Sequence, residues 1–338
     1  MAKLKKNSKI KLTAQMDKSE FFQEQEVIPT DVPMMNVALT GSLDGGITAG
    51  LTVLAGPSKH FKTSFALKMA AAYLNAKPDA VMLFYDSEFG SPQSYFDNFG
   101  IDTSRVLHVP IMDVEELKFD IIAQLEDMDK EDDVIIVIDS IGNLASKKEL
   151  EDAKNEKSVA DMSRAKALKG LFRMTTPYLA MKNIPLLAVN HTYKEIGLYP
   201  KDIVGGGTGI YYSANNIWII GRRQNKTGTE VMGYDFVIKV EKSRFVKEQS
   251  KIPITVSWEG GIDEMSGLLD VAMASGHVIK PSNGWYQKVN EEKKYRLADL
   301  DKNFWSSILE DQVFQEFVKK AFSVGSATID LDIEVEGD

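Results

Sequence analysis

The chain has 338 residues, of which 43% are hydrophobic, and it carries a net charge of −9. This length supplies one large or two moderate domains with a sizeable core. The composition has no cysteine, which excludes a disulfide framework and thiolate metal sites, and the four histidines lack the spacing of metal ligands. The acidic balance by itself argues against nucleic-acid binding, because contacts to phosphate normally rest on clustered lysine and arginine.

The two ends of the chain have opposite charge. Residues 1–18 contain six lysines and one aspartate, whereas residues 326–338 contain five acidic residues and no basic one. This asymmetry indicates interaction tails, although solvated termini have the same composition. The basic end lacks the apolar region of a signal peptide, and no stretch approaches the roughly 18 apolar residues that span a bilayer. We therefore expect a cytoplasmic protein with no membrane contact.

Short apolar runs with helix-length segments between them predict the core. The runs are LTVLA (51–55), VMLFYD (81–86), VIIVID (134–139), IPLLAVN (184–190), NIWIIG (216–221) and FVIKVE (236–241), and helical periodicity marks 62–75, 113–128 and 158–182. Runs that are apolar on both faces predict an α/β fold with a mainly parallel central sheet flanked by helices, over about 35–260. The later runs follow closely and predict antiparallel strands at one sheet edge.

Two connections look irregular, at 146–157 and 192–209. Connections of this length inside a compact core are uncommon and are usually functional or disordered. Beyond Gly260 the chain becomes a small helical segment with Trp285, Tyr286, Phe304 and Trp305. We expect a small C-terminal domain at 261–325, followed by an acidic tail at 326–338.

The strongest chemical signal is GPSKHFKT (56–63), which lies between the first strand and a helix. In such a P-loop, backbone N–H groups at a helix N-terminus bind phosphates, Lys62 reaches the β and γ oxygens, and the Thr63 hydroxyl binds Mg²⁺. Phe61 stands where glycine is usual, so its backbone must tolerate a Cβ or the loop must shift. The predicted contacts to ATP are Gly56, Pro57, Ser58, Lys59, His60, Phe61, Lys62, Thr63 and Ser64.

A P-loop needs a second carboxylate for the Mg²⁺ shell, and Asp139 ends a buried strand. Taken alone, such an aspartate is as often a helix N-cap. Together with the P-loop, Asp139 is predicted to hold Mg²⁺ through water.

Hydrolysis also needs a group that orients or deprotonates water. Glu88 follows the strand at 81–86, which we expect beside the P-loop strand, and Asp86 is the competing candidate. Tyr95, about one turn into the next helix, is a candidate for stacking on a base or a core residue.

Asn190 and His191 end the strand IPLLAVN, at the edge where open α/β sheets bind ligands. A structural histidine is the simpler alternative. The basic segment 239–251 contains Lys242 and Arg244, and taken alone it is typical of a solvated strand face.

Seven segments carry a family resemblance, in chain order: GPSKHFKT, LFYDSEFG, VIIVIDSIGNLASKKE, PLLAVNHTY, VGGGTG, VEKSR and GLLDVAMASGHVIKPSNGWY. The chain resembles the RecA-type strand-exchange recombinases, most closely the UvsX recombinases of tailed bacteriophages. The likeness covers about 33–286, and Phe61 is itself a feature of the phage subgroup.

The resemblance implies an ATP-dependent DNA recombinase that forms a helical filament on single-stranded DNA and catalyses homologous pairing and strand exchange. Glu88 would activate water, Asp139 would hold Mg²⁺, and Tyr95 would stack on adenine. His191 would sense the γ-phosphate, and Lys242 and Arg244 would reach a neighbouring subunit's ATP. Implied partners are single- and double-stranded DNA, further copies of the chain, a recombination mediator and a single-strand-binding protein, in the cytoplasm of an infected bacterial host.

In this family the two irregular connections are DNA-binding loops, which map onto about 144–164 and 192–209. A basic inner groove would reconcile DNA binding with the acidic total charge. The candidate DNA contacts are Lys147, Lys148, Lys154, Lys157, Arg164, Lys194, Lys201, Gly205, Gly206 and Gly207. Residues 1–34 are expected to form an oligomerisation segment, with FFQEQEVIPT as its docking element.

Two other functions fit a P-loop core. A hexameric replicative helicase would carry a separate N-terminal domain, whereas about 35 residues precede the core here. A signalling ATPase leaves the GGGTG loop and the lysine-bearing loop unexplained.

Overall fold

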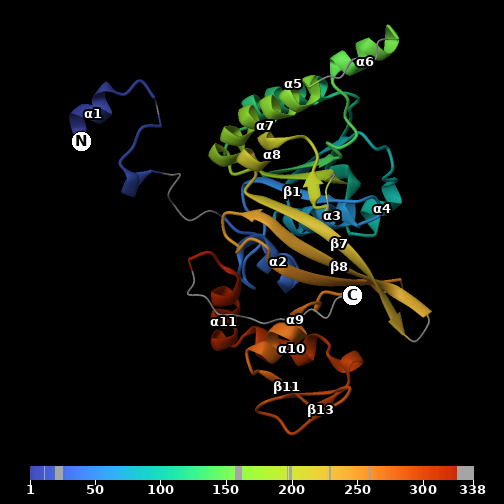
Figure 1. Ribbon diagram of the computed structural model, residues 1–338. Coiled ribbons are helices and arrows are strands. Elements are labelled where there is room, and N and C mark those ends of the chain that lie inside the picture. The colour runs from blue at the N-terminus through green and yellow to red at the C-terminus, as the bar shows by residue number, and fades with distance from the viewer. Residues whose placement is uncertain are drawn as a thin grey trace.

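A computed structural model describes residues 1–10, 12–19, 26–156, 162–195, 197, 200–227, 230–258 and 260–325. A ten-stranded sheet crosses the molecule in the order β10-β9-β8-β7-β1-β5-β4-β2-β3, with β6 paired to β5 (Figure 1). Its strands are β1 Gly50–Gly56, β2 Val81–Asp86, β3 Val106–Pro110, β4 Val134–Asp139, β5 Pro185–Lys194, β6 Asp202–Val204, β7 Asn216–Thr227, β8 Glu230–Ser243, β9 Lys251–Ser257 and β10 Gly261–Ile262.

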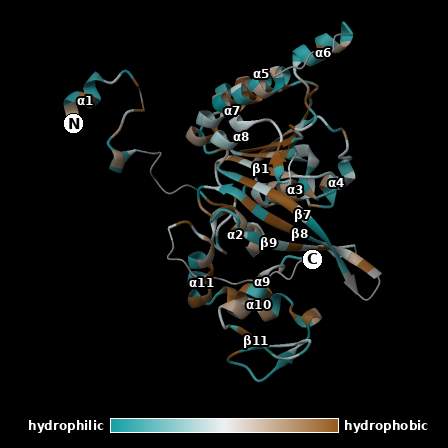
Figure 2. Cartoon of the chain, viewed as in Figure 1, coloured by the Kyte–Doolittle hydropathy of each residue, from teal (hydrophilic) through white to brown (hydrophobic). Residues whose placement is uncertain are grey.

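The central strands are buried on both faces. β1 and β4 are buried throughout, and they pair in parallel with β5 between them. The apolar residues of these strands form the hydrophobic centre in Figure 2. All six predicted runs are strands. β3 was missed because it is a short, half-exposed edge strand, and β9 was missed although it alternates buried and partly buried residues, as a strand with one buried face does.

One predicted neighbour relation is wrong. β2, which precedes Glu88, does not lie beside the P-loop strand β1, because β5 and β4 separate them. β2 pairs instead with β3 and β4. Both β1 and β2 nevertheless end at the same edge of the sheet, since all these central strands are parallel.

Helices cover both faces of the sheet and form two hydrophobic clusters. On one face α2 and α3 pack with residues such as Phe65 and Phe236, and on the other α5 and α7 pack with residues such as Leu117 and Phe172. The predicted helices correspond to α3, α5 and α7, with 158–161 outside the described residues. The helices up to this point are α1 Ala2–Asn7, α2 Pro33–Thr40, α3 Lys62–Ala76, α4 Gln93–Asp97, α5 Val114–Asp127, α6 Lys147–Lys154, α7 Ser163–Met181 and α8 Thr208–Ser213, with 3-10 helices η1 Met16–Lys18 and η3 Thr103–Arg105.

The far side of the sheet is antiparallel, as expected from the closely spaced later runs. β7 pairs in parallel with β1, but β8 pairs antiparallel with β7, and β9 with β8. These long strands extend well beyond the parallel part of the sheet (Figure 1). The chain therefore combines a parallel, helix-covered half with a projecting antiparallel half.

The C-terminal part is a mixed unit and not the helical segment that we expected. It contains a separate three-stranded sheet, and Trp285 and Tyr286 lie on its central strand. Its core, with Phe304, Trp305 and Phe314, joins the hydrophobic cluster of α2 and α3. Its elements are α9 Leu268–Ala274, β11 Val278–Ser282, β12 Trp285–Lys288, β13 Lys294–Tyr295, η4 Leu297–Asp299, α10 Lys302–Leu309 and α11 Gln312–Phe322.

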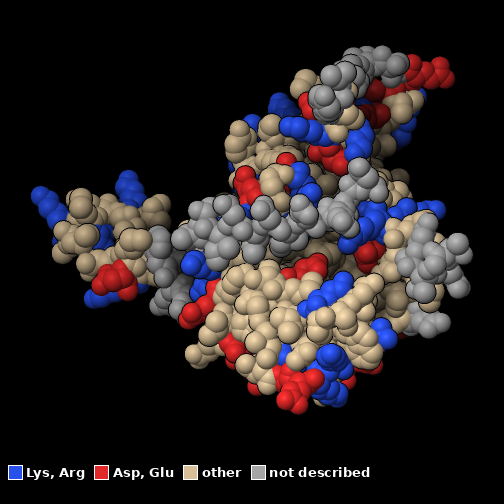
Figure 3. All heavy atoms as spheres, turned by 60° about the horizontal axis from the view of Figure 1, so that its bottom comes forward, with Lys and Arg blue, Asp and Glu red and all other residues tan. Residues whose placement is uncertain are grey.

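The N-terminal segment projects from the body of the molecule, and its lysines stand out in the space-filling view (Figure 3). No residue of α1 or η1 is buried. The chain joins the body where Ile28 pairs with Ile47. Residues 21–25 of the expected docking element, and the acidic tail at 326–338, lie outside the described residues. Among the described helices, none is long and apolar enough to cross a membrane.

Candidate functional site

The predicted P-loop joins β1 to α3, as the sequence pattern requires. Gly56 ends β1, and a Cβ there would lie 2.9 Å from the Ile220 carbonyl oxygen, so the close approach of β7 favours glycine. Lys59 and Phe61 both adopt left-handed backbone, with φ of 61° and 60°. Two left-handed residues curl the loop ahead of Lys62, where α3 begins.

Phe61 keeps this left-handed conformation although it carries a Cβ. Such a conformation costs a residue other than glycine about 1–2 kcal/mol. The Phe61 ring stacks on Phe236 at 5.2 Å between centroids and meets the edge of Phe65 at 5.6 Å. Aromatic pairs of this kind contribute about 0.5–1.5 kcal/mol each beyond burial. The core packing of its ring thus offsets the backbone strain at a position where glycine is usual.

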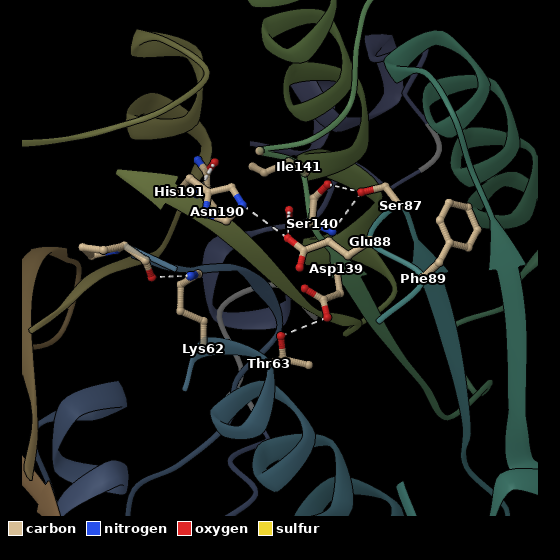
Figure 4. A network of polar contacts seen from close by, with 12 residues as sticks. Lys62, Thr63, Ser87, Glu88, Phe89, Asp139, Ser140, Ile141, Asn190 and His191 are labelled. Carbon is tan, nitrogen blue, oxygen red and sulfur yellow. Dashed lines mark hydrogen bonds and ion pairs between the residues drawn. The ribbon is translucent and has the colours of Figure 1, made fainter. Parts of the chain in front are cut away.

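Lys62, Thr63 and Asp139 meet at the start of α3 (Figure 4). The Lys62 ammonium donates to the Pro57 carbonyl at 2.8 Å, and the Thr63 hydroxyl donates to Asp139 Oδ2 at 2.9 Å. Burial lowers the pKa of Lys62, against the opposing attraction of Glu88 and Asp139. Burial, and next the charge of Glu88, raise the pKa of Asp139 to about 7.

These residues fit a magnesium ion. Asp139 Oδ1 is buried and has no hydrogen-bond partner among the described residues. A hydroxyl and a carboxylate are the oxygen donors that Mg²⁺ prefers, usually with several waters retained. The buried Asp139 Oδ1 is therefore available to bind a cation or one of its waters.

Glu88 and Thr63 lie on opposite sides of Asp139, and Glu88 belongs to a network of polar contacts (Figure 4). Its Oε1 accepts from the Ser140 hydroxyl at 2.7 Å and lies 3.3 Å from His191 Nε2. The hydrogen bond with His191 is the main cause that lowers the pKa of Glu88, and burial opposes it. Neither contact uses Oε2.

Asp86, the competing candidate, is placed differently. Its side chain is buried, and both of its oxygens are taken up by protein contacts. Asp86 does not line the cavity beside the P-loop, whereas Glu88 does.

A cavity of about 420 Å³ lies against the P-loop. Glu88, Tyr95 and His191 line it together with residues 58–64. The Tyr95 hydroxyl is hydrogen-bonded to the Ser64 hydroxyl, and its ring meets the edge of Phe99. Most of the predicted nucleotide contacts therefore line this one cavity.

Among the further side chains of this cavity that sequence reasoning missed, three form a connected group beside the P-loop. Arg222, Tyr234 and Trp258 come from the antiparallel half of the sheet. Arg222 donates to the Lys59 carbonyl at 3.0 Å and lies over the Tyr234 ring, which contacts Trp258. No motif marks these residues, because only the pairing of β7, β8 and β9 brings them to the P-loop.

His191 stands between this cavity and the second irregular connection. Its carbonyl accepts from the Gly205 N–H at 3.0 Å, and the Asn190 amide donates to the Gly205 carbonyl at 2.8 Å. A Cβ on Gly142 would lie 2.3 Å from His191 Cδ2, so the ring packs directly on that glycine. The end of β5 thus forms hydrogen bonds with Gly205 on one side and contacts Glu88 on the other.

Lys242 and Arg244 do not line the cavity of their own chain. The Lys242 ammonium donates to the Tyr211 carbonyl, and to the Ala214 carbonyl at 2.9 Å, at the end of α8. Burial, and then the nearby Arg244, lower the pKa of Lys242. The structure therefore separates both cations from the P-loop within one chain.

The first connection is more regular than expected. Residues 147–154 form the helix α6, which begins with a capping box between Ser146 and Glu149. Lys147, Lys148 and Lys154 lie exposed on this helix, and Lys157 lies outside the described residues.

Arg164, a predicted DNA contact, binds the backbone of its own chain. Its guanidinium donates to the carbonyls of Leu144, Ile141 and Gly142 at 2.5, 2.8 and 2.9 Å. An arginine that holds three backbone carbonyls fixes the turn after β4 and has few donors left for phosphate.

The second connection is also partly ordered. β6 pairs antiparallel with the end of β5, so part of 192–209 is a hairpin. Lys194 is ion-paired with Asp202 at 2.9 Å, and Lys201 is exposed. Gly206 and Gly207 have φ of 92° and 76°, a left-handed region that favours glycine.

Sequence reasoning missed a basic hollow between α5 and α7. It has a volume of about 540 Å³, and Lys118, Lys166, Lys169 and Arg173 line it with a single carboxylate, Glu115. None of these four cations has an ion pair within the described part of the chain. The three on α7 are three and four residues apart, a spacing that places them on one helix face and that the sequence displays.

Comparisons with known proteins cover the whole chain. The RecA N-terminal domain family model matches residues 3–263, and a model described as the C-terminal domain of the bacteriophage T4 recombination and repair protein matches residues 265–318. The recombination and repair protein of Enterobacteria phage T4 is 47% identical over 348 residues, which cover 100% of this chain and 89% of that relative. Protein RecA of Thermus aquaticus is 27% identical over 266 residues, covering 77% and 75%, and that of Bacteroides thetaiotaomicron is 28% identical over 268 residues, covering 78% of each.

Proposed function

We propose a function for this chain on the basis of its family. The chain belongs to the RecA family. It is an ATP-dependent DNA recombinase that forms a helical filament on single-stranded DNA and catalyses homologous pairing and strand exchange in phage recombination, repair and recombination-dependent replication. The observation that carries this proposal is the contact of 3.3 Å between Glu88 and His191, beside the P-loop cavity. It links a nucleotide site to the connection at 192–209.

The cavity would hold ATP. Backbone N–H groups of residues 56–63 and the Lys62 ammonium would bind the phosphates, while Tyr95 and the aromatic side chains of the opposite wall would contact the base. Thr63 and Asp139 would hold Mg²⁺, the latter through water. When bound, Mg²⁺ supplies positive charge to the phosphate oxygens.

Glu88 is the proposed base that orients and deprotonates the attacking water. Its carboxylate, whose pKa is lowered chiefly by the hydrogen bond with His191, is ionised at neutral pH and can accept a proton. Oε1 is held by Ser140 and His191, which leaves Oε2 for water. His191 would transmit the state of the γ-phosphate through the Gly205 backbone to the second connection.

Lys242 and Arg244 are proposed to complete a neighbouring subunit's site. Within one chain they lie away from the cavity, which is what a cation acting across a subunit boundary requires. Such a cation stabilises charge on the transferring phosphoryl group. Hydrolysis would then depend on filament assembly, with residues 1–34 docking on the adjacent copy.

The DNA surface would combine the two connections with the basic hollow. The hollow adjoins the first connection through Ser163, whose hydroxyl lies 2.5 Å from that of Ser146. Lysine and arginine side chains that gather in a groove attract a phosphate backbone even when the total charge is negative. Double-stranded DNA, a recombination mediator and a single-strand-binding protein are further proposed partners.

The double variant Lys166→Ala/Arg173→Ala should weaken binding to single-stranded DNA and reduce its dependence on salt. Each lost phosphate contact lowers the slope of log affinity against log salt by about 0.7. Fluorescence anisotropy over a range of salt concentrations measures this slope. The matched variant Lys280→Ala/Lys294→Ala removes two exposed lysines of the small sheet and should keep the slope. An unchanged slope in the first variant would remove the hollow from the DNA surface.

Electron microscopy with single-stranded DNA and a slowly hydrolysed ATP analogue tests the function as a whole. Open helical filaments that need both ligands are expected. Closed rings would favour a hexameric helicase, and no DNA-dependent assembly would favour a signalling ATPase.

A further inference from the structure

Asp86 is a buried carboxylate that the proposed chemistry does not use. It ends β2, where it lies between Pro110 of β3 and Asp139 of β4, and its residue is 4% exposed. Its Oδ1 accepts from the backbone N–H groups of Glu88 at 3.0 Å and Phe89 at 2.8 Å. Its Oδ2 lies 3.2 Å from His108 Nε2.

These contacts shape the segment that carries Glu88. Phe89 has a left-handed φ of 54°, which costs a residue with a Cβ about 1–2 kcal/mol. Two backbone amides donate to the same carboxylate oxygen, and hydrogen bonds from backbone N–H groups to a carboxylate are among the stronger ones, so Asp86 offsets that strain. The left-handed turn sends the Glu88 and Phe89 side chains to opposite sides (Figure 4).

Residues 86–89 therefore lie between two cavities. Glu88 lines the P-loop cavity, whereas Phe89 lines a second cavity of about 580 Å³ together with Asp86 and His108. A small rotation of the segment would move the Glu88 carboxylate out of the P-loop cavity. The position of that carboxylate thus depends on its own contacts with Ser140 and His191 and on what fixes the backbone of residues 86–89.

Backbone hydrogen bonds hold the start of this segment, from the Ser87 N–H to the Asp139 carbonyl at 2.8 Å and from the Ile111 N–H to the Asp86 carbonyl at 2.9 Å, and two side chains add further contacts. Ser87 holds it to β4, since its hydroxyl donates to the Ser140 carbonyl at 2.7 Å and accepts from the Ser140 N–H at 3.1 Å. Asp86 alone holds the Glu88 amide among the described residues. His108 in turn keeps Asp86 oriented, and its ring stacks on Phe84 at 5.9 Å between centroids.

We propose that Asp86 is the positioning residue for Glu88 in ATP hydrolysis, and that His108 holds Asp86 in the orientation that this requires. The proposal rests on the proposed role of Glu88 as the base. Asp86 acts on the backbone of Glu88 and does not touch the nucleotide cavity, so its loss affects turnover and leaves nucleotide binding intact.

The test compares DNA-stimulated ATP hydrolysis in full-length variants. Asp86→Asn should lower kcat about 10- to 100-fold, as loss of an orienting partner does, with an unchanged KM for ATP. His108→Leu should also lower kcat, whereas His108→Gln keeps an amide donor and should retain most of it. Asp102→Asn is the matched control, because Asp102 caps η3 on the same connection without contacting Glu88.

A second comparison separates positioning from general damage. In a Glu88→Gln background, Asp86→Asn should lower the residual kcat much less than it does in the wild type, since its main effect passes through Glu88. The proposal is overturned if Asp86→Asn keeps wild-type kcat, if its effect is additive with Glu88→Gln, or if KM rises together with a loss of thermal stability. A wild-type protein without DNA-stimulated hydrolysis would instead overturn the proposed function.

Discussion

Replacing Glu88 by glutamine should lower DNA-stimulated ATP hydrolysis about 100- to 10,000-fold, the usual effect of removing a general base. Glutamine keeps the size of the side chain and can still accept from the Ser140 hydroxyl, which lies 2.7 Å from Oε1. The negative charge beside His191 and the ability to take a proton from water are lost. Nucleotide binding and filament formation should therefore survive, and filaments should persist longer because ATP is not consumed.

Phosphate release measured with single-stranded DNA gives the rate, and electron microscopy gives the assembly. Glu116→Gln is a suitable control, since Glu116 lies in the first turn of α5 and does not line the P-loop cavity. If Glu88→Gln hydrolyses ATP at the wild-type rate, Glu88 is not the base.

Replacing Lys62 by alanine should abolish nucleotide-dependent filament formation. The Lys62 ammonium is the one buried cation of the P-loop within the described residues, and its N–H groups now bind the Pro57 carbonyl. A hydrogen bond to a charged group is worth about 1.5–3 kcal/mol, so its loss should weaken ATP binding by about 10- to 100-fold.

Binding of a fluorescent ATP analogue and electron microscopy with single-stranded DNA together measure this effect. Lys280→Ala, at an exposed position of β11, controls for the loss of one positive charge. Filaments of Lys62→Ala that form at the same ATP concentration as those of the wild type would show that Lys62 does not bind the phosphates.

Local patterns predicted much of the fold. The parallel core was predicted from apolar runs at β1, β2, β4 and β5 and from helical periodicity at α3, α5 and α7. Burial on a sheet face or a helix face leaves such patterns in the sequence. The antiparallel edge followed from the short spacing of the later strands. Elements without such a pattern were not predicted from the sequence, and the half-exposed edge strand β3 is an example.

The sequence also predicted which residues would gather at the site, but their roles stay predictions. The P-loop motif, Glu88 and His191 stood at strand ends, and parallel strands bring their ends to one edge of the sheet. The order of those strands was not predictable, and β2 was placed wrongly beside β1. Strand order depends on the long connections and on packing across the whole sheet, which no local pattern encodes.

The sequence by itself determined the fold class, the P-loop and the family resemblance, because each depends on residue types at fixed spacing along the chain. Only the tertiary structure decided that core packing of the Phe61 ring offsets its strained backbone, that the guanidinium of Arg164 binds backbone carbonyls, and that Asp86 holds the Glu88 amide. The tertiary structure also brought Arg222 and Trp258 to the nucleotide cavity and exposed the basic hollow on α7. These features arise from contacts between residues that are distant in sequence or from the direction of single side chains, and both are set by the packed chain as a whole.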